Sequence, residues 1–157
     1  IAKGFGMEVY AFDPYCPAEA IEAEGVKPIT DINEMYSTCQ YISLHIPATP
    51  ETKKSINYNL LKQMPKGAVL INTARKEVID EEELVKLMED RADFKYISDI
   101  KPDNASVFAE KFEGRYFFTP KKMGAQTAEA NINAGIAAAK QSVGFLKEGI
   151  DKFKVNK

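Results

Sequence analysis

Two adjacent lysines stand where an aromatic run gives way to a helical pattern, in "YFFTPKKMGAQTAEA". An ammonium group in such a strand-to-helix turn can pair with an anionic ligand, and a neutral amine there can accept a proton. Lys121 and Lys122 are therefore candidates for binding an anionic ligand or for accepting a proton from it. A solvated turn is the alternative, because most lysines lie at the protein surface.

An arginine and an aspartate follow two other apolar segments. Arg75 lies three residues beyond Asn72 in "INTARKEVIDEEEL". A guanidinium there can bind a carboxylate through two hydrogen bonds and polarise a neighbouring carbonyl, or it can simply lie in solvent. Asp13 closes "VYAFDP". At a strand end of a dinucleotide fold such a carboxylate accepts hydrogen bonds from the adenosine ribose, whereas Asp-Pro by itself is a turn former.

The only histidine of the chain, His45, ends another apolar segment, in "ISLHIPATPET". Its imidazole can serve as a general base, contact a cofactor or make a structural hydrogen bond. The residue types alone leave these three roles open.

Short apolar strands that alternate with helical patterns must position these side chains. Two helix starts carry a capping pattern, Asp31 with Glu34 and Asp80 with Glu83. Strands that alternate with helices and lack hairpin turns predict an α/β fold, with a mostly parallel, doubly wound sheet covered on both faces. Ligands bind outside the carboxyl ends of the strands in such a sheet. The predicted strands span residues 7–12, 41–45, 68–72, 95–99 and 115–119.

Composition excludes several classes of function. The 157 residues carry 21 basic and 23 acidic side chains, so we expect no basic field and no nucleic-acid partner. Cys16 and Cys39 match neither a metal-ligand spacing nor a disulfide framework, so we expect no metal site and a cytoplasmic location. No apolar run approaches the ~18 residues of a membrane span, so we expect no membrane partner.

Four stretches together resemble the nucleotide-binding domain of the D-isomer-specific 2-hydroxyacid dehydrogenases. They are "GFGMEVYAFDPY", "ISLHIPATPET", "MPKGAVLINTARKEVIDEEEL" and "MGAQTAEA", and they match in order and spacing over nearly the whole chain. The resemblance implies a Rossmann-like domain and an NAD-dependent hydride transfer at C2 of a small anionic 2-hydroxy acid. The most similar branch of the family oxidises 3-phosphoglycerate to 3-phosphohydroxypyruvate, which opens serine biosynthesis.

The resemblance also implies roles for single residues. Asp13 would bind the ribose, Arg75 the substrate carboxylate and carbonyl, and Asp99 the nicotinamide carboxamide. Relatives form homodimers through this domain. The residues expected to line the cofactor side are His45, Pro47, Asn72, Thr73 and Ala74.

In the family, the glycine fingerprint and the first strand lie just before the position that Ile1 occupies here. We therefore expect residues 1–124 to be a partial dinucleotide-binding domain. We expect residues 125–157 to form a long helix and a tail that reach toward a substrate domain. The resemblance implies that these residues alone would be inactive.

Three departures from the family pattern bear on mechanism. Lys122 stands where the family keeps its catalytic histidine, Asn104 stands in place of the supporting acid with Asp103 beside it, and Lys76 replaces the usual glycine. Lys122 can act as a base only if its pKa falls some three units below the reference value of about 10.4. Otherwise it remains a charged donor that polarises the C2 oxygen. Lys121 would be the counter-charge of the anionic substrate.

Two other functions remain compatible with these residues. One is a catalytically weak member of the family that binds NAD(H) as a sensor or as a partner-binding module. The other is a dehydrogenase for a different 2-hydroxy acid, such as glycerate or lactate.

Overall fold

The chain forms two compact units in the computed structural model, Ile1–Pro120 and Lys121–Lys157, and the structure describes residues 1–120, 127–152 and 154. The domain boundary predicted at residue 124 therefore falls outside the described residues.

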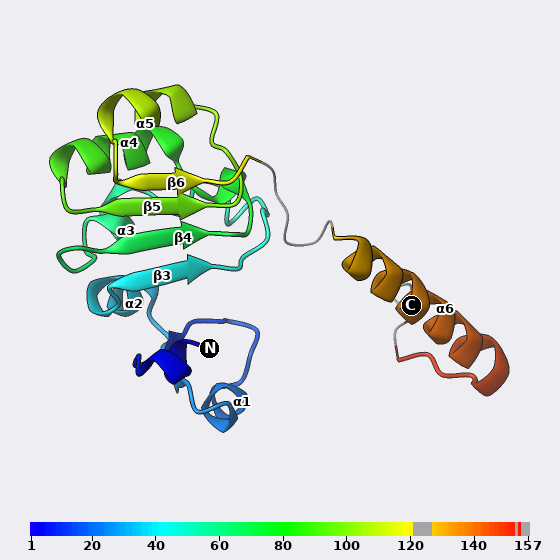
Figure 1. The fold of residues 1–157 in the computed structure, drawn as a ribbon. Helices are drawn as coiled ribbons and strands as arrows, with labels where there is room; N and C mark the ends of the chain where they lie inside the picture. Colours follow the sequence, from blue (N-terminus) through cyan, green and yellow to red (C-terminus); the bar gives the residue numbers. More distant parts are fainter. Residues whose placement is uncertain (121–126, 153, 155–157) are drawn as a thin grey trace. The chain divides into compact units, whose positions relative to one another are not determined.

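A four-stranded parallel sheet is the centre of the first unit (Figure 1). Its strands lie side by side in chain order. Because every neighbouring pair is parallel, all their carboxyl ends meet at one edge of the sheet. Leu44, Asn72, Ser98 and Phe118 form the last register row before this edge. The strands are β3 (Tyr41–Leu44), β4 (Val69–Asn72), β5 (Lys95–Ser98) and β6 (Tyr116–Phe118).

A second, two-stranded parallel sheet lies in the amino-terminal part of the same unit. It pairs β1 (Tyr10–Ala11) with β2 (Lys27–Pro28). The sequence predicts the first of these strands but makes it longer, and it does not predict β2, because two residues are too few for a visible alternation of apolar and polar side chains. The predicted α/β class is confirmed.

Two helices of the first unit, α2 and α4, begin where local capping predicts. The Asp31 carboxylate accepts a hydrogen bond from the Asn33 amide, and the Asp80 carboxylate accepts one from the Glu83 amide. The short helix α5 was not predicted, since its N-cap makes no side-chain hydrogen bond. The α-helices are α1 (Ala18–Ala23), α2 (Ile32–Thr38), α3 (Tyr58–Leu61), α4 (Glu81–Asp90) and α5 (Ala105–Lys111), and the 3₁₀ helices are η1 (Ala2–Phe5) and η2 (Lys76–Val78).

The hydrophobic core lies between one face of the four-stranded sheet and helices α2 to α5. Leu70 on β4, Leu87 on α4 and Phe108 on α5 are fully buried there. The opposite face differs from the prediction that both faces are covered: Ile97 is 37% exposed and Phe117 59%. In the part of the chain that the structure describes, the helices of the core cluster pack against one face only.

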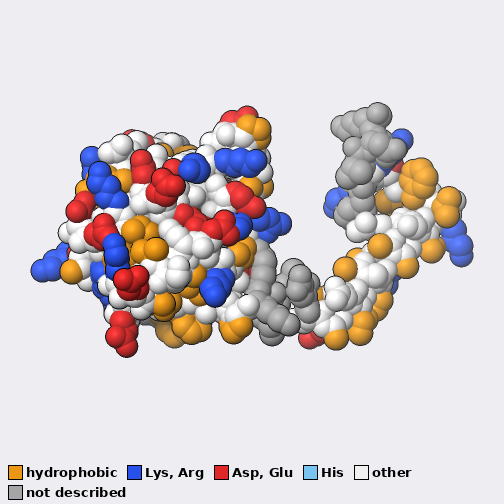
Figure 2. Space-filling model, turned by 90° about the horizontal axis from the view of Figure 1, so that it is seen from above, with side chains coloured by type: hydrophobic (Ala, Val, Ile, Leu, Met, Phe, Trp, Pro, Cys, Tyr) orange, Lys and Arg blue, Asp and Glu red, His pale blue; other side chains and the backbone are white. Residues whose placement is uncertain are grey.

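The second unit contains α6 (Ala128–Glu148), a 21-residue helix. Thr127 caps its start by accepting a hydrogen bond from the Ala130 amide, and Gly149 ends it in the left-handed conformation. Its apolar side chains are exposed and run along the helix (Figure 2), among them Ile132 and Leu146. This helix lies within residues 125–157, for which the sequence predicts a long helix and a tail; that they reach toward a substrate domain stays a prediction. None of the described helices is both long and apolar enough to cross a membrane.

Candidate functional site

The loop that carries Arg75 folds around the side chain of Asn72, the last residue of β4. The Asn72 Oδ1 accepts a hydrogen bond from the Ala74 amide at 3.0 Å, and its Nδ2 donates to the Arg75 carbonyl at 3.0 Å. Asn72 is 0% exposed. Both polar groups of this buried side chain are thus used by the backbone of the following three residues.

The ends of β4 and β5 are joined by a second buried polar side chain. Ser98 is 1% exposed. Its hydroxyl donates to the Asn72 carbonyl at 3.0 Å and accepts from the Ile100 amide at 3.1 Å. The Asp99 amide donates to the same Asn72 carbonyl at 3.2 Å. Sequence reasoning missed Ser98, although a serine on the buried face just before a strand-end aspartate is a usable signal.

Asp99 presents an unsatisfied acceptor at this edge. Its backbone is held on both sides, because its carbonyl accepts from the Thr119 hydroxyl at 3.0 Å. Its Oδ1 is buried and has no hydrogen-bond partner among the described residues. A buried acceptor without a donor costs about 1–3 kcal/mol. The atom therefore fits a ligand that brings an N–H group, and a carboxamide is such a ligand.

Arg75 lies exposed at the same edge. Its Nη1 donates to the Ala74 carbonyl at 3.0 Å, and the described residues include no carboxylate paired with it. The remaining guanidinium donors can take a carboxylate in the two-bond geometry that arginine favours. Thr73, which precedes Ala74 and Arg75, is also exposed.

His45 and Pro47 lie in the loop that follows β3, and both are exposed. The His45 Nε2 and the Ser43 hydroxyl are 2.9 Å apart and hydrogen-bonded. The Pro47 carbonyl accepts from the Thr52 hydroxyl at 2.6 Å, which closes the following turn. The hydrogen bond to Ser43 fixes the Nε2 side of the His45 imidazole and leaves the role of Nδ1 open.

Asp13 follows β1 and is exposed. Its Oδ1 accepts a hydrogen bond from the Tyr15 amide at 2.9 Å. The carboxylate thus performs the turn role that Asp-Pro predicts, and its other oxygen is available to a ribose hydroxyl. A role in binding ribose stays a prediction.

Asp103 is paired with Lys76, the residue that the sequence resemblance puts in place of a glycine. The Lys76 Nζ lies 2.6 Å from the Asp103 Oδ1, and this hydrogen bond raises the pKa of Lys76. The Glu81 carboxylate accepts from the Asp103 and Asn104 amides at 2.9 and 3.2 Å, and burial raises the pKa of Glu81. The acid predicted to support catalysis is therefore already engaged by a neighbouring cation.

An open cavity of about 680 Å³ lies beside this ion pair. Three lysines contribute to its wall, but acidic side chains accompany them, so it is not a basic pocket. Arg75 and Asp99 do not line it. The lining residues are Lys53, Lys54, Lys76, Glu77, Ile79, Glu81, Glu82, Asp103 and Asn104.

Lys121 and Lys122 lie outside the described residues. Within the described ranges, no cluster of three or more His, Cys, Asp or Glu side chains is arranged to hold a metal ion. The surface in Figure 2 carries both charge signs, with acidic and basic side chains interspersed over the first unit.

Comparison with known proteins places this arrangement in a family. Residues 1–110 match the model of the NAD binding domain of the D-isomer specific 2-hydroxyacid dehydrogenases. The chain belongs to this family. The family resemblance found in the sequence is confirmed, and so is NAD as the cofactor of the domain.

Two relatives illustrate the similarity. D-3-phosphoglycerate dehydrogenase of Methanocaldococcus jannaschii is 34% identical over 160 residues, which cover 99% of this chain and 30% of the relative. The NAD⁺-bound crystal structure of 3-phosphoglycerate dehydrogenase from Entamoeba histolytica matches with a TM-score of 0.84 and 47% identity, covering 99% of this chain and 49% of that one.

The family also contains relatives with other substrates in their names. D-lactate dehydrogenase of Escherichia coli is 34% identical over 110 residues, which cover 70% of this chain and 33% of the relative. This chain spans less than half the length of each of these relatives.

Proposed function

We propose that the protein that contains this chain is an NAD-dependent dehydrogenase that oxidises 3-phosphoglycerate to 3-phosphohydroxypyruvate. One observation carries the proposal: at one sheet edge the backbones of Arg75 and Asp99 are both hydrogen-bonded to Asn72. The Arg75 guanidinium is exposed there, and the Asp99 Oδ1 has no hydrogen-bond partner among the described residues. The family assignment and the similarity to phosphoglycerate dehydrogenases support the choice of reaction and substrate.

The oxidation removes a hydride from C2 and a proton from the C2 hydroxyl, and NAD supplies the hydride acceptor when it is bound. Asp99 would accept a hydrogen bond from the nicotinamide carboxamide, and Asp13 from the ribose. His45, Pro47, Thr73 and Ala74 would line the cofactor side.

Arg75 would bind the substrate carboxylate and polarise the C2 oxygen. A guanidinium suits this task because it stays charged at every physiological pH and offers parallel N–H donors. Lys121 would contribute a second positive charge toward the phosphate group.

Lys122 would take the place of the family's histidine. A lysine with a neutral amine would remove the C2 hydroxyl proton, whereas a charged lysine would polarise the oxygen while water carries the proton. Support from Asp103 would require this carboxylate to leave Lys76, with which it is paired at 2.6 Å. The pH dependence of kcat/KM separates the two roles, because a flat profile between pH 6 and 9 excludes a titrating base.

Turnover of the full-length protein with 3-phosphoglycerate and NAD tests the proposal, with glycerate and lactate as competing substrates. We expect the highest kcat/KM for 3-phosphoglycerate. A preference for another acid would correct the substrate. No turnover above background, combined with measurable NADH binding, would overturn the proposed enzymatic activity and favour an NAD(H) sensor. This is the second candidate, because the proposed alignment puts Lys122 in the place of a catalytic histidine.

The full-length protein is further proposed to be a cytoplasmic homodimer. Light scattering behind size-exclusion chromatography tests the dimer, and a monomeric mass would refute it. Cell fractionation tests the location.

A further inference from the structure

We propose that Asn72 is a positioning residue that holds Arg75 in place for the substrate carboxylate, instead of a side chain that contacts the cofactor. The inference rests on the proposed function of Arg75. It departs from the cofactor-side role that the family resemblance implies for Asn72.

The direction of the Asn72 side chain carries the first step. Asn72 shares its register row with Leu44 and Ser98, which are buried at 6% and 1% exposure. Neighbouring residues of one row in a parallel sheet project to the same face. Asn72 therefore points into the helix-covered face, where its side chain is 0% exposed and, unlike the Asp99 Oδ1, has hydrogen-bond partners in the protein.

The hydrogen bonds carry the second step. An amide side chain has one acceptor oxygen and one donor group. The oxygen receives the Ala74 amide and the nitrogen reaches the Arg75 carbonyl, both at 3.0 Å. Two bonds of opposite sense to consecutive residues fix the course of the backbone directly at Arg75.

The consequence concerns the geometry of the guanidinium. Arg75 is exposed, and the described residues hold its side chain through one hydrogen bond to its own neighbour, the Ala74 carbonyl. The two hydrogen bonds from Asn72 to the backbone of Ala74 and Arg75 are then the main determinant of the position from which the Arg75 side chain extends. Misplacement of a substrate-binding group by about 1 Å can reduce a rate about 100-fold.

A double-mutant cycle in the full-length protein tests the inference, with Asn72→Ala, Arg75→Ala and the double variant. We expect Asn72→Ala to lower kcat/KM for 3-phosphoglycerate 10- to 100-fold, with less than a twofold change in the Kd of NADH. In the Arg75→Ala background the same substitution should lower kcat/KM less than twofold. If Arg75→Ala has no measurable turnover, the cycle is run on the Kd of 3-phosphoglycerate from calorimetry.

Two further measurements separate positioning from loss of structure. Amide hydrogen exchange at Ala74 should accelerate in Asn72→Ala while exchange in the core strands stays unchanged. Arg91→Ala is the matched control: this residue bonds the Met64 and Pro65 carbonyls at the opposite edge of the sheet, and its removal should lower stability without changing kcat/KM below the melting temperature. If Asn72→Ala does not fold, Asn72→Ser takes its place in the cycle.

Three results would overturn the inference. They are a tenfold rise in the Kd of NADH on substitution of Asn72, an equal loss of kcat/KM in both backgrounds, and unchanged exchange at Ala74. A normal kcat/KM for Arg75→Ala would instead overturn the proposed role of Arg75, so the two failures are distinguishable.

Discussion

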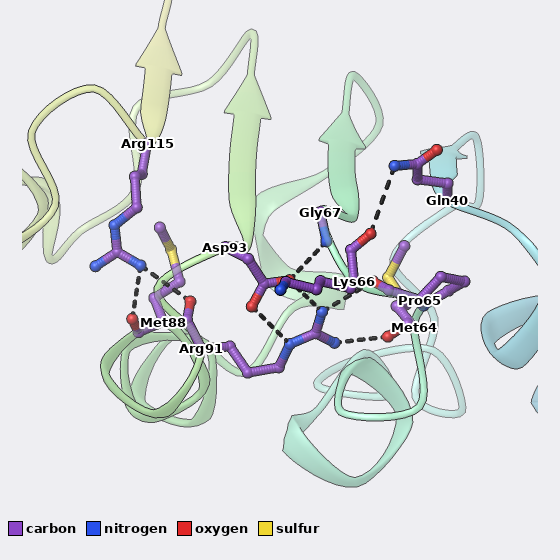
Figure 3. A network of polar contacts seen from close by, with 9 residues as sticks. All are labelled: Gln40, Met64, Pro65, Lys66, Gly67, Met88, Arg91, Asp93 and Arg115. Carbon is purple, nitrogen blue, oxygen red and sulfur yellow. Dashed lines mark hydrogen bonds and ion pairs between the residues drawn. The ribbon is translucent and has the colours of Figure 1, made fainter.

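Substitution of Arg91 by alanine should destabilise the domain through a polar network at the amino edge of the sheet (Figure 3). The Arg91 guanidinium donates to the Met64 carbonyl at 2.6 Å and to the Pro65 carbonyl at 2.8 Å. It also pairs with the Asp93 carboxylate at 2.6 Å, and Asp93 in turn accepts from the Gly67 amide at 2.6 Å. The network thus joins the end of α4 to the turn that precedes β4.

The burial of this pair sets the magnitude. The Arg91 and Asp93 side chains are only 18% and 27% exposed, so water replaces the lost bonds incompletely. Hydrogen bonds to charged groups contribute about 1.5–3 kcal/mol each, and neighbouring bonds do not add. We expect Arg91→Ala to lower the free energy of unfolding by about 3 kcal/mol. For a unit of this size, with about 4 °C per kcal/mol, that corresponds to a fall in Tm of roughly 12 °C.

The network also makes stability depend on pH. The hydrogen bond from Arg91 lowers the pKa of Asp93 in the folded state, with further contributions from the Gly67 amide. A lowered folded-state pKa stabilises the protein above the unfolded pKa of about 3.9, and this stabilisation is lost as the pH falls toward the folded value. Asp93→Asn removes the titrating group. The difference in Tm between the wild type and Asp93→Asn should therefore shrink as the pH falls below about 5.

Thermal denaturation of the full-length protein at pH 7 and about pH 3 measures both effects, and hydrogen exchange at the Gly67 amide reports the network locally. Lys86→Ala is a suitable surface control, because Lys86 is exposed, its ammonium lies over the Tyr58 ring at 5.2 Å, and it makes no ion pair within the described part of the chain. A Tm for Arg91→Ala within 1 °C of the wild type would refute the reasoning. So would a difference between the wild type and Asp93→Asn that stays constant with pH.

Three other substitutions have definite expected outcomes. Tyr36→Phe should raise the free energy of unfolding by about 1–3 kcal/mol, because the Tyr36 hydroxyl is buried without a partner among the described residues; a lower Tm would show that it has one. Lys54 has a φ of 54°, a left-handed backbone conformation that strains every residue with a Cβ atom. Lys54→Gly and Lys54→Ala both lose the 3.3 Å contact with Asp80, but only alanine keeps this strain. Lys54→Gly should therefore be about 1 kcal/mol more stable than Lys54→Ala, and equal denaturation midpoints would contradict this. Ser98→Ala should raise the Kd of NADH in a fluorescence titration several-fold with a smaller effect on the KM of the hydroxy acid, because Ser98 holds the backbone beside Asp99; the reverse pattern would argue against the cofactor-side role of Asp99.

The secondary structure that could be predicted is the part that depends on near neighbours in the chain. Asp31 and Asp80 cap helices through amides two and three residues away, so the signal lies within one turn. The four longer strands show as apolar runs for the same reason. The strand β2 and the helix α5 lack such local signals, since they are held by pairing and packing with distant segments.

The candidate site divides in the same way. The residue types at the strand ends, Arg75 and Asp99 above all, follow from the sequence, because parallel strands must bring their carboxyl ends to one edge. The tertiary structure decided what each side chain does there. Asn72 turns inward and binds backbone, Ser98 links two strand ends, and Asp103 pairs with Lys76. The Ser98 and Lys76 contacts join residues 26 and 27 positions apart, and the inward direction of Asn72 depends on strand register, so no local pattern encodes them.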